Sequence, residues 1–77
     1  MKVDVQLLGY LAKFSPTEKE KFKLELPSEA TIFDLLAKIK FPPDLQKMVL
    51  VNGRQANPST VLAEDDDIFI FAPAAGG

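Results

Sequence analysis

The sequence predicts an α+β domain in which one main helix packs on one face of a four- to five-stranded mixed sheet. Two segments near the N-terminus alternate apolar and polar residues, which is the pattern of half-buried strands. One segment in the middle has apolar residues at helical spacing. Two short apolar runs follow, each next to turn-forming residues. With 77 residues, the chain is expected to form one domain, residues 1–71, and a short tail, residues 72–77.

The first half of the chain contains the two alternating segments. Every second side chain is apolar in residues 2–7, KVDVQL, and residues 21–26, KFKLEL, repeat the pattern. Because sequential strands usually pair, we expect these two to be antiparallel neighbours. Between them, the apolar residues of segment 10–14 have the spacing of a short helical turn that covers one end of a core.

Thr31 begins the predicted helix. Its side chain is a good N-cap, and Asp34 stands where it completes a capping box and favours the positive end of the helix dipole. One apolar stripe follows, made by Ile32, Leu35, Leu36 and Ile39. We expect a helix of about nine or ten residues. Phe41-Pro42-Pro43 should end it, because the residue before a proline is pushed out of the helical region.

The second half predicts a hairpin and then an acidic turn. The apolar run Met48-Val49-Leu50-Val51 is followed by Asn52-Gly53, the strongest short turn signal, and Arg54-Gln55 starts a short return strand. Further on, Glu64-Asp65-Asp66-Asp67 places carboxylates in a row. Calcium loops need spaced ligands and a glycine for the sharp turn, so we interpret this run as an acidic turn and predict no metal site.

The most apolar run in the chain is Ile68-Phe69-Ile70-Phe71. It has no polar alternation, which is typical of a central strand with two apolar faces. A single helix covers only one face of a sheet, so either the isoleucines or the phenylalanines must lie on a face that the chain covers poorly. Exposed apolar patches on small domains usually mark a partner surface. We take Phe69 and Phe71 as candidate docking residues, joined by Leu8 on the outward side of the first strand.

Composition excludes several classes of function. The chain contains no histidine and no cysteine, which removes most zinc sites, histidine bases and thiolate nucleophiles. We therefore expect no catalytic residue of its own. The net charge of −2 argues against a nucleic-acid partner, which would require surplus lysine and arginine. The sequence starts with charged residues, and no apolar run approaches the ~20 residues of a membrane span, so we predict a cytoplasmic protein with no membrane association.

Three motifs point to a family. They are Val3-x-Val5-x-Leu7-Leu8, Leu50-Val51-Asn52-Gly53-Arg54 and Asp66-Asp67-Ile68-Phe69-Ile70-Phe71-Ala72-Pro73-Ala74-Ala75-Gly76-Gly77. With these motifs, and with the order strand, strand, helix, strand, short strand, strand, the sequence resembles the MoaD/ThiS sulfur carriers of the β-grasp, ubiquitin-like fold. It looks most like the small subunit of molybdopterin synthase. The family usually has glycine where this chain has Asp65, but aspartate tolerates the left-handed region, so we expect the turn to survive.

The resemblance implies that the protein is a carrier and substrate, not an enzyme. A ubiquitin-activating-type adenylyltransferase would use ATP and magnesium to adenylate the carboxylate of Gly77. A persulfide sulfur would then displace AMP and leave a C-terminal thiocarboxylate. The large subunit of molybdopterin synthase, or an equivalent sulfur-acceptor enzyme, would insert that sulfur into a pterin precursor. The carrier itself is expected to bind no cofactor.

The composition of the tail suits this role. Six residues span at most ~20 Å when extended, which is enough to thread an enclosed active site. Pro73 limits flexibility near the sheet, and Ala74 and Ala75 keep the tether narrow. Gly76 and Gly77 have no Cβ, so the backbone of an enzyme can approach them closely.

The residues leave other functions open. An activated Gly77 also serves a ubiquitin-like modifier, in which the carboxylate ends in an isopeptide bond to lysine. A sulfur carrier can supply thiamine, tRNA or cysteine pathways in place of molybdopterin. A third alternative is a β-grasp interaction module whose terminal Gly-Gly is incidental.

Overall fold

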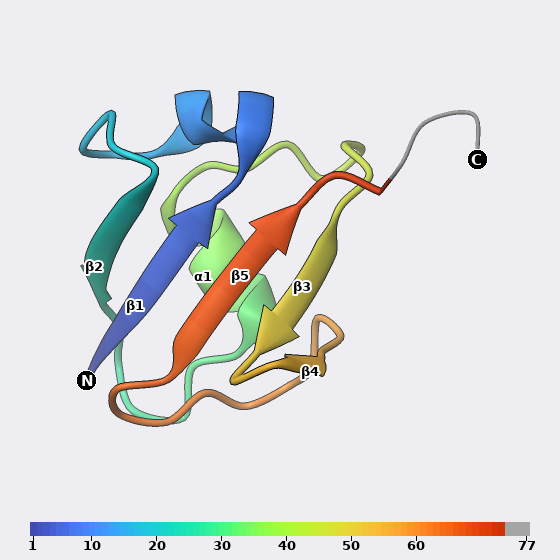
Figure 1. Cartoon of the computed structure of the whole chain (residues 1–77). Helices are drawn as coiled ribbons and strands as arrows, with labels where there is room; N and C mark the ends of the chain where they lie inside the picture. The colour runs from blue at the N-terminus through green and yellow to red at the C-terminus, as the bar shows by residue number, and fades with distance from the viewer. Residues whose placement is uncertain (74–77) are drawn as a thin grey trace.

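The computed structural model describes residues 1–73, which form a five-stranded mixed sheet with one α-helix packed on one face (Figure 1). The elements are β1 Lys2–Leu7, the 3-10 helix η1 Gly9–Phe14, β2 Lys21–Glu25, α1 Ile32–Lys38, β3 Met48–Val51, β4 Arg54–Gln55 and β5 Asp67–Phe71. The strand order is β2-β1-β5-β3-β4, in which β1 and β5 are parallel and the other neighbours antiparallel. This arrangement confirms the expected fold class.

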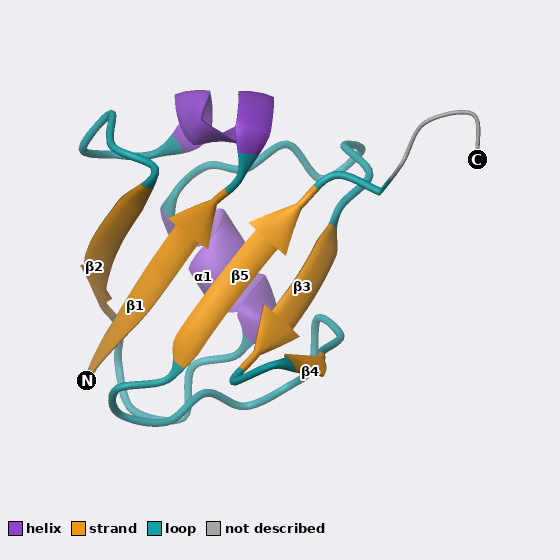
Figure 2. Ribbon diagram, viewed as in Figure 1, coloured by secondary structure: helices purple, strands orange, loops and turns teal. Residues whose placement is uncertain are grey.

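The central position of β5 explains its unbroken apolar sequence. The strand lies between β1 and β3, and α1 crosses behind the three (Figure 2). Its Ile68 and Ile70 are buried between the sheet and the helix, together with Leu35 of α1. In the parallel register, Val5 and Leu7 of β1 are the partners of these two isoleucines. The alternate residues of each strand therefore build the core on the helix side of the sheet.

The connection between β1 and β2 contains the short helical turn that the sequence predicts. Gly9 has φ +62°, which reverses the chain after β1, and η1 then places Leu11 in the core. The turn covers the end of the sheet at which β1 and β5 finish (Figure 1). Within the described residues, 1–73, no helix is long and apolar enough to cross a membrane.

Helix α1 begins as expected and ends earlier. The backbone N–H of Asp34 donates to Thr31 Oγ1 at 3.3 Å, and the N–H of Thr31 donates to Asp34 Oδ2 at 2.9 Å, which completes the capping box. The helix has seven residues, fewer than the nine or ten expected. It is ended by a Schellman motif and not by the prolines, because Lys40 adopts φ +57°. In that motif the N–H of Phe41 donates to the carbonyl of Leu36 at 2.9 Å.

Replacing Lys40 with glycine should therefore stabilise the domain. A side chain in the left-handed region costs on the order of 1 kcal/mol that glycine avoids. We expect Lys40→Gly to raise the free energy of unfolding by about 0.5–1 kcal/mol in a urea titration. The matched control is Lys38→Gly inside the helix, which should lower it by about 1 kcal/mol. Equal destabilisation by both variants would contradict this account of the helix end.

Two turns connect the remaining strands. Asn52 and Gly53 have φ +53° and +83°, so the Asn-Gly dipeptide makes the β3–β4 hairpin as predicted. Asp65 has φ +66°, which confirms that aspartate accepts the left-handed conformation before the last strand. The Asn52 side chain joins the two turns, because its Nδ2 donates to Asp66 Oδ1 and its Oδ1 accepts from the N–H of Asp67, each at 2.9 Å. This network positions the start of β5.

Candidate docking face and tail exit

The sheet face away from α1 has an apolar centre, which we call the open face. Phe69 projects from β5 onto it and is 38% exposed. In the antiparallel register with β3, Leu50 lies opposite Phe69 and Met48 lies opposite Phe71. Met48, Leu50 and Phe71 are half-buried. No helix or loop of residues 1–73 covers this face (Figure 2), so the phenylalanine set of β5, and not the isoleucine set, is the one left open.

Leu8 joins the open face at the end of β1. Its backbone N–H donates to the carbonyl of Ile70 at 2.9 Å, which extends the parallel pairing by one residue beyond Leu7. Leu8 is half-buried, next to the end of β5 that carries Phe71. The structure therefore brings together the three docking candidates that the sequence singles out.

Met48 and Leu50 also belong to the open face, although they are not among the docking candidates predicted from the sequence. The missed signal is that Met48–Val51, like the last strand, has no polar alternation. Two such strands side by side must present apolar residues on both faces. The sequence does not show that these two strands pair, so it did not identify Met48 and Leu50 as neighbours of the phenylalanines.

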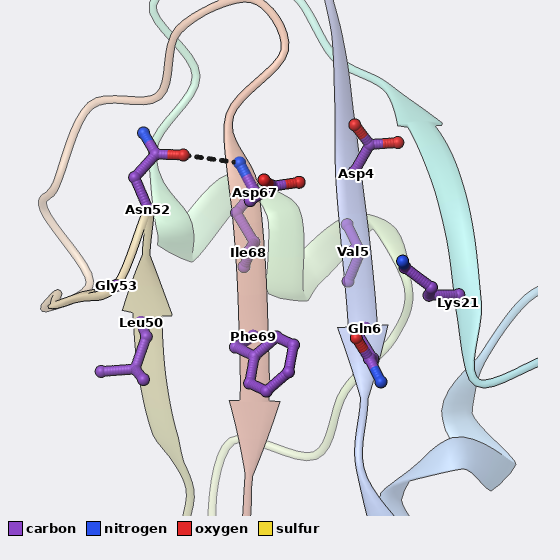
Figure 3. A pocket seen from close by; sticks show the side chains of 10 residues that line it. All are labelled: Asp4, Val5, Gln6, Lys21, Leu50, Asn52, Gly53, Asp67, Ile68 and Phe69. Atoms are coloured by element: carbon purple, nitrogen blue, oxygen red, sulfur yellow. Dashed lines mark hydrogen bonds between the residues drawn. The ribbon is translucent and has the colours of Figure 1, made fainter.

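Polar residues border the apolar centre on the side of β1 and β2. Figure 3 shows Gln6 beside the Phe69 ring and Lys21 beyond it, and these residues line a shallow hollow of about 400 Å³ with Leu50. Gln6 Nε2 donates to Glu20 Oε1 at 3.0 Å. An apolar centre with a polar border is the usual composition of a protein–protein interface.

The end of the sheet at the start of β5 is acidic. Lys23 Nζ donates to Asp4 at 2.9 Å, and this is the one ion pair among the described residues. The hydrogen bond to Asp4, followed by the charge of that carboxylate, raises the pKa of the Lys23 ammonium, and Asp65 and Asp67 add to the effect. The carboxylates therefore create a negative field at this end.

The acidic run forms a turn through its side chains. Glu64 Oε1 accepts from the N–H of Lys2 at 3.1 Å, and Asp66 Oδ2 accepts from the N–H of Ala63 at 2.8 Å. Within residues 1–73, no group of three or more acidic side chains is arranged to hold a metal ion. Two of the four carboxylates, those of Glu64 and Asp66, therefore hold the turn through hydrogen bonds to backbone groups.

The tail leaves the sheet at the opposite end, where β5 finishes. Ala72 packs against the border of the core, and Pro73, which is half-buried, is the last described residue. The tail positions Ala74, Ala75, Gly76 and Gly77 lie outside the described residues. The chain contains no cysteine or histidine, so it offers no thiolate or imidazole for covalent or acid–base chemistry.

Comparison with protein-family models matches residues 5–77 to the ThiS family. The chain belongs to the ThiS family. ThiS-family proteins are small carrier proteins, and the match includes the open-face residues and the whole tail of this one. None of the curated proteins matches the chain.

Solved structures with the same fold cover 95–100% of this ThiS-family chain. A putative molybdopterin converting factor subunit 1 from Pyrococcus furiosus has a TM-score of 0.81 and 23% identity, over 95% of this chain and 98% of that one. SAMP1 from Haloferax volcanii has a TM-score of 0.79 and 20% identity, over 100% of both chains. In a complex of subunits 1 and 2 of the molybdopterin-converting factor from Helicobacter pylori, the matching chain has a TM-score of 0.66 and 23% identity, over 100% of both chains. At these identities the likeness shows a shared β-grasp fold.

Proposed function

We propose that this ThiS-family protein is a sulfur carrier, activated at Gly77, that donates sulfur in molybdopterin assembly. The observation that supports the proposal most is the arrangement of the last strand. β5 is central, presents Phe69 on a face that residues 1–73 leave uncovered, and passes directly into the tail. A partner that docks on the open face therefore lies beside the origin of the tail.

The proposed activation makes the carboxylate of Gly77 electrophilic. An oxygen of that carboxylate attacks the α-phosphorus of ATP in the activating enzyme, and pyrophosphate leaves. A persulfide of a partner then attacks the carbonyl carbon of the acyl-adenylate and AMP leaves, which forms an acyl disulfide. A second thiol of the partner cleaves the sulfur–sulfur bond, becomes part of a disulfide, and releases the thiocarboxylate on Gly77. The ATP, the magnesium and the thiols belong to the partners. Because the reactions consume ATP and need reduced thiols, we propose the cytoplasm as their compartment.

The open face is the proposed docking surface for both enzymes. Two partners that act in turn require one surface that each can bind and release. Aromatic and methionine side chains are enriched at such interfaces, and Phe69, Phe71 and Met48 provide them beside the tail exit. Pro73, Ala74, Ala75 and Gly76 would then form the narrow segment that enters each active site.

Assignment to molybdopterin is supported by two of the similar structures. The one from Pyrococcus furiosus is described as a putative molybdopterin converting factor subunit 1, and the one from Helicobacter pylori is a complex of subunits 1 and 2 of the molybdopterin-converting factor. The resemblance of the C-terminal motif to the small subunit of molybdopterin synthase points the same way. By analogy, the acceptor enzyme would be the large subunit of molybdopterin synthase.

Mass spectrometry of the protein isolated from its native host tests this proposal. We expect a fraction of the C-terminal peptide to have one oxygen replaced by sulfur, and alkylation of the thiocarboxylate should label that fraction. The matched control is a variant with one alanine added after Gly77, which should show no sulfur. A host that lacks the gene should also lack molybdopterin and recover it with the wild-type gene. Unchanged molybdopterin in that host would contradict the pathway assignment.

A protein modifier is the second candidate function. It is favoured by the similarity to SAMP1, a small archaeal modifier protein, over the full length of both chains. The two functions share the adenylate and differ in the nucleophile that attacks it. Because the last basic residue before the tail is Arg54, trypsin would leave residues 55–77 of a conjugated protein on the target. Peptides from the same host with this segment attached through Gly77 to a lysine side chain would indicate conjugation, and their absence alongside the sulfur-containing peptide would indicate a carrier alone.

A further inference from the structure

The two ends of the sheet differ in charge. Segments 9–20 and 39–47 lie at the end where β5 passes into the tail, while the turn before β5 lies at the other end (Figure 1). In and next to the two segments, lysines outnumber carboxylates: Lys13, Lys19, Lys21, Lys38, Lys40 and Lys47 against Glu18, Glu20 and Asp44. Around the other end carboxylates outnumber basic residues: Asp4, Glu25, Glu64, Asp65, Asp66 and Asp67 against Lys2, Lys23 and Arg54. The molecule is therefore acidic overall but cationic around the tail exit, and we call this end the cationic pole.

Two lysines of the cationic pole are held over aromatic rings. Lys13 Nζ lies 5.3 Å from the ring centroid of Phe14, and Lys47 Nζ lies 5.6 Å from that of Phe41. The two rings contact each other, with centroids 5.0 Å apart and planes inclined at 54°. This ladder of cation, ring, ring and cation joins η1 to the loop before β3. Cation–π contacts at exposed sites contribute about 0.5–1 kcal/mol each, so they favour one placement of each ammonium group.

The ladder lies beside the tail exit. Lys47 directly precedes Met48, which pairs with Phe71, the last residue of β5. On the other side, η1 contacts the ends of both β1 and β5. Phe14 and Ala72 pack against the same core. Neither lysine has a carboxylate within ion-pair distance among the described residues, so their charges are available to a partner.

We infer that the cationic pole docks on an acidic surface that surrounds the active-site entrance of the activating enzyme. This inference rests on the proposed function, because it requires the tail to enter that enzyme. Opposite charges accelerate association and set orientation, and here the negative far end would be repelled by the same surface. The charge separation therefore directs the carrier to approach with its tail first.

The partner surface is protein and not the phosphates of the bound nucleotide. The six residues after β5 span at most ~20 Å. When they extend into an active site to bring Gly77 to ATP, the lysines at their base remain outside with the globular domain. Lys13 and Lys47 then face the border of the entrance. The inference thus predicts an effect on the KM for the carrier and none on the KM for ATP.

The test is ATP–pyrophosphate exchange by the activating enzyme from the same host, measured against carrier concentration and salt. The test variant is Lys13→Glu/Lys47→Glu, and the control Lys2→Glu/Arg54→Glu makes the same change in net charge away from the tail exit. We expect the test variant to raise the KM for the carrier about tenfold at low salt, and the control to change it less than about twofold. Added salt should raise the KM of the wild type and not that of the test variant.

Equal effects of both double variants would show that the enzyme responds to the net charge of the carrier, which would overturn the inference. An unchanged KM for the carrier in the test variant, or a raised KM for ATP, would also overturn it. If thermal unfolding shows that the glutamate variant does not fold, the milder Lys13→Gln/Lys47→Gln variant replaces it. This variant should raise the KM for the carrier about threefold. Absence of exchange with the wild-type carrier would overturn the proposed function, and the inference with it.

Discussion

Deletion of Gly77 should abolish activation without unfolding the domain. The deletion moves the terminal carboxylate back by one residue, about 3.3–3.6 Å of extended chain. A displacement of about 1 Å already lowers the rate of a well-positioned reaction on the order of 100-fold. We therefore expect kcat/KM for ATP-dependent activation to fall at least about 100-fold. Within residues 1–73 the buried hydrophobic residues lie between Val3 and Ile70, and a glycine has no side chain to bury, so we expect the deletion to leave the core intact.

The measurement pairs ATP–pyrophosphate exchange with thermal unfolding of the same preparation. The unfolding midpoint should stay within about 2 °C of wild type, because no buried side chain is lost. A second variant with one alanine added after Gly77 keeps the Gly-Gly sequence and displaces the carboxylate outward. It should also be inactive. Full activity in either variant would refute Gly77 as the activated residue, and a large fall in the midpoint would refute the prediction that Gly77 contributes nothing to the stability of the domain.

Truncation of Phe69 to alanine should weaken partner binding much more than it weakens the fold. A central aromatic residue in an interface typically contributes 2 kcal/mol or more, which corresponds to about 30-fold in Kd. The ring is 38% exposed, and its neighbours Leu50 and Gln6 lie on the open face and not in the core. Its loss should therefore lower the free energy of unfolding by less than about 2 kcal/mol.

Phe33→Ala is the matched control for Phe69→Ala. The two variants remove the same atoms, and Phe33 is 66% exposed on α1, on the other side of the sheet. Calorimetric titration of the sulfur-acceptor enzyme should give a Kd near that of wild type for Phe33→Ala and a Kd raised about 30-fold for Phe69→Ala. Comparable losses in both variants would show that the open face is not the specific docking surface.

Local physics made most elements predictable. Alternation in β1 and β2 follows from one buried face, and the Thr31 capping box depends on residues only three apart. The Asn52-Gly53 turn and the left-handed Asp65 follow from the φ values that those residues accept. The end of α1 was less predictable. Nothing in a lysine marks it for φ +57°, so the sequence favoured the prolines as the helix terminus.

The docking residues could be predicted only in part from the sequence. Leu8, Phe69 and Phe71 could be named because an apolar strand with two apolar faces needs more cover than one helix provides. The sequence did not decide whether the isoleucines or the phenylalanines of β5 face the helix, because both sets of side chains are apolar. Nor did it predict that Met48 and Leu50 lie on the open face, because their position there depends on the pairing of β3 with β5.

The sequence by itself determined the element types, the fold class, the family resemblance and the absence of histidine and cysteine chemistry, because each depends on composition or on neighbours along the chain. Tertiary structure alone decided which face of β5 stays open, which strands extend that face, and that Lys13 and Lys47 join through aromatic rings beside the tail exit. These features bring together residues far apart in sequence, and strand order and register set their positions.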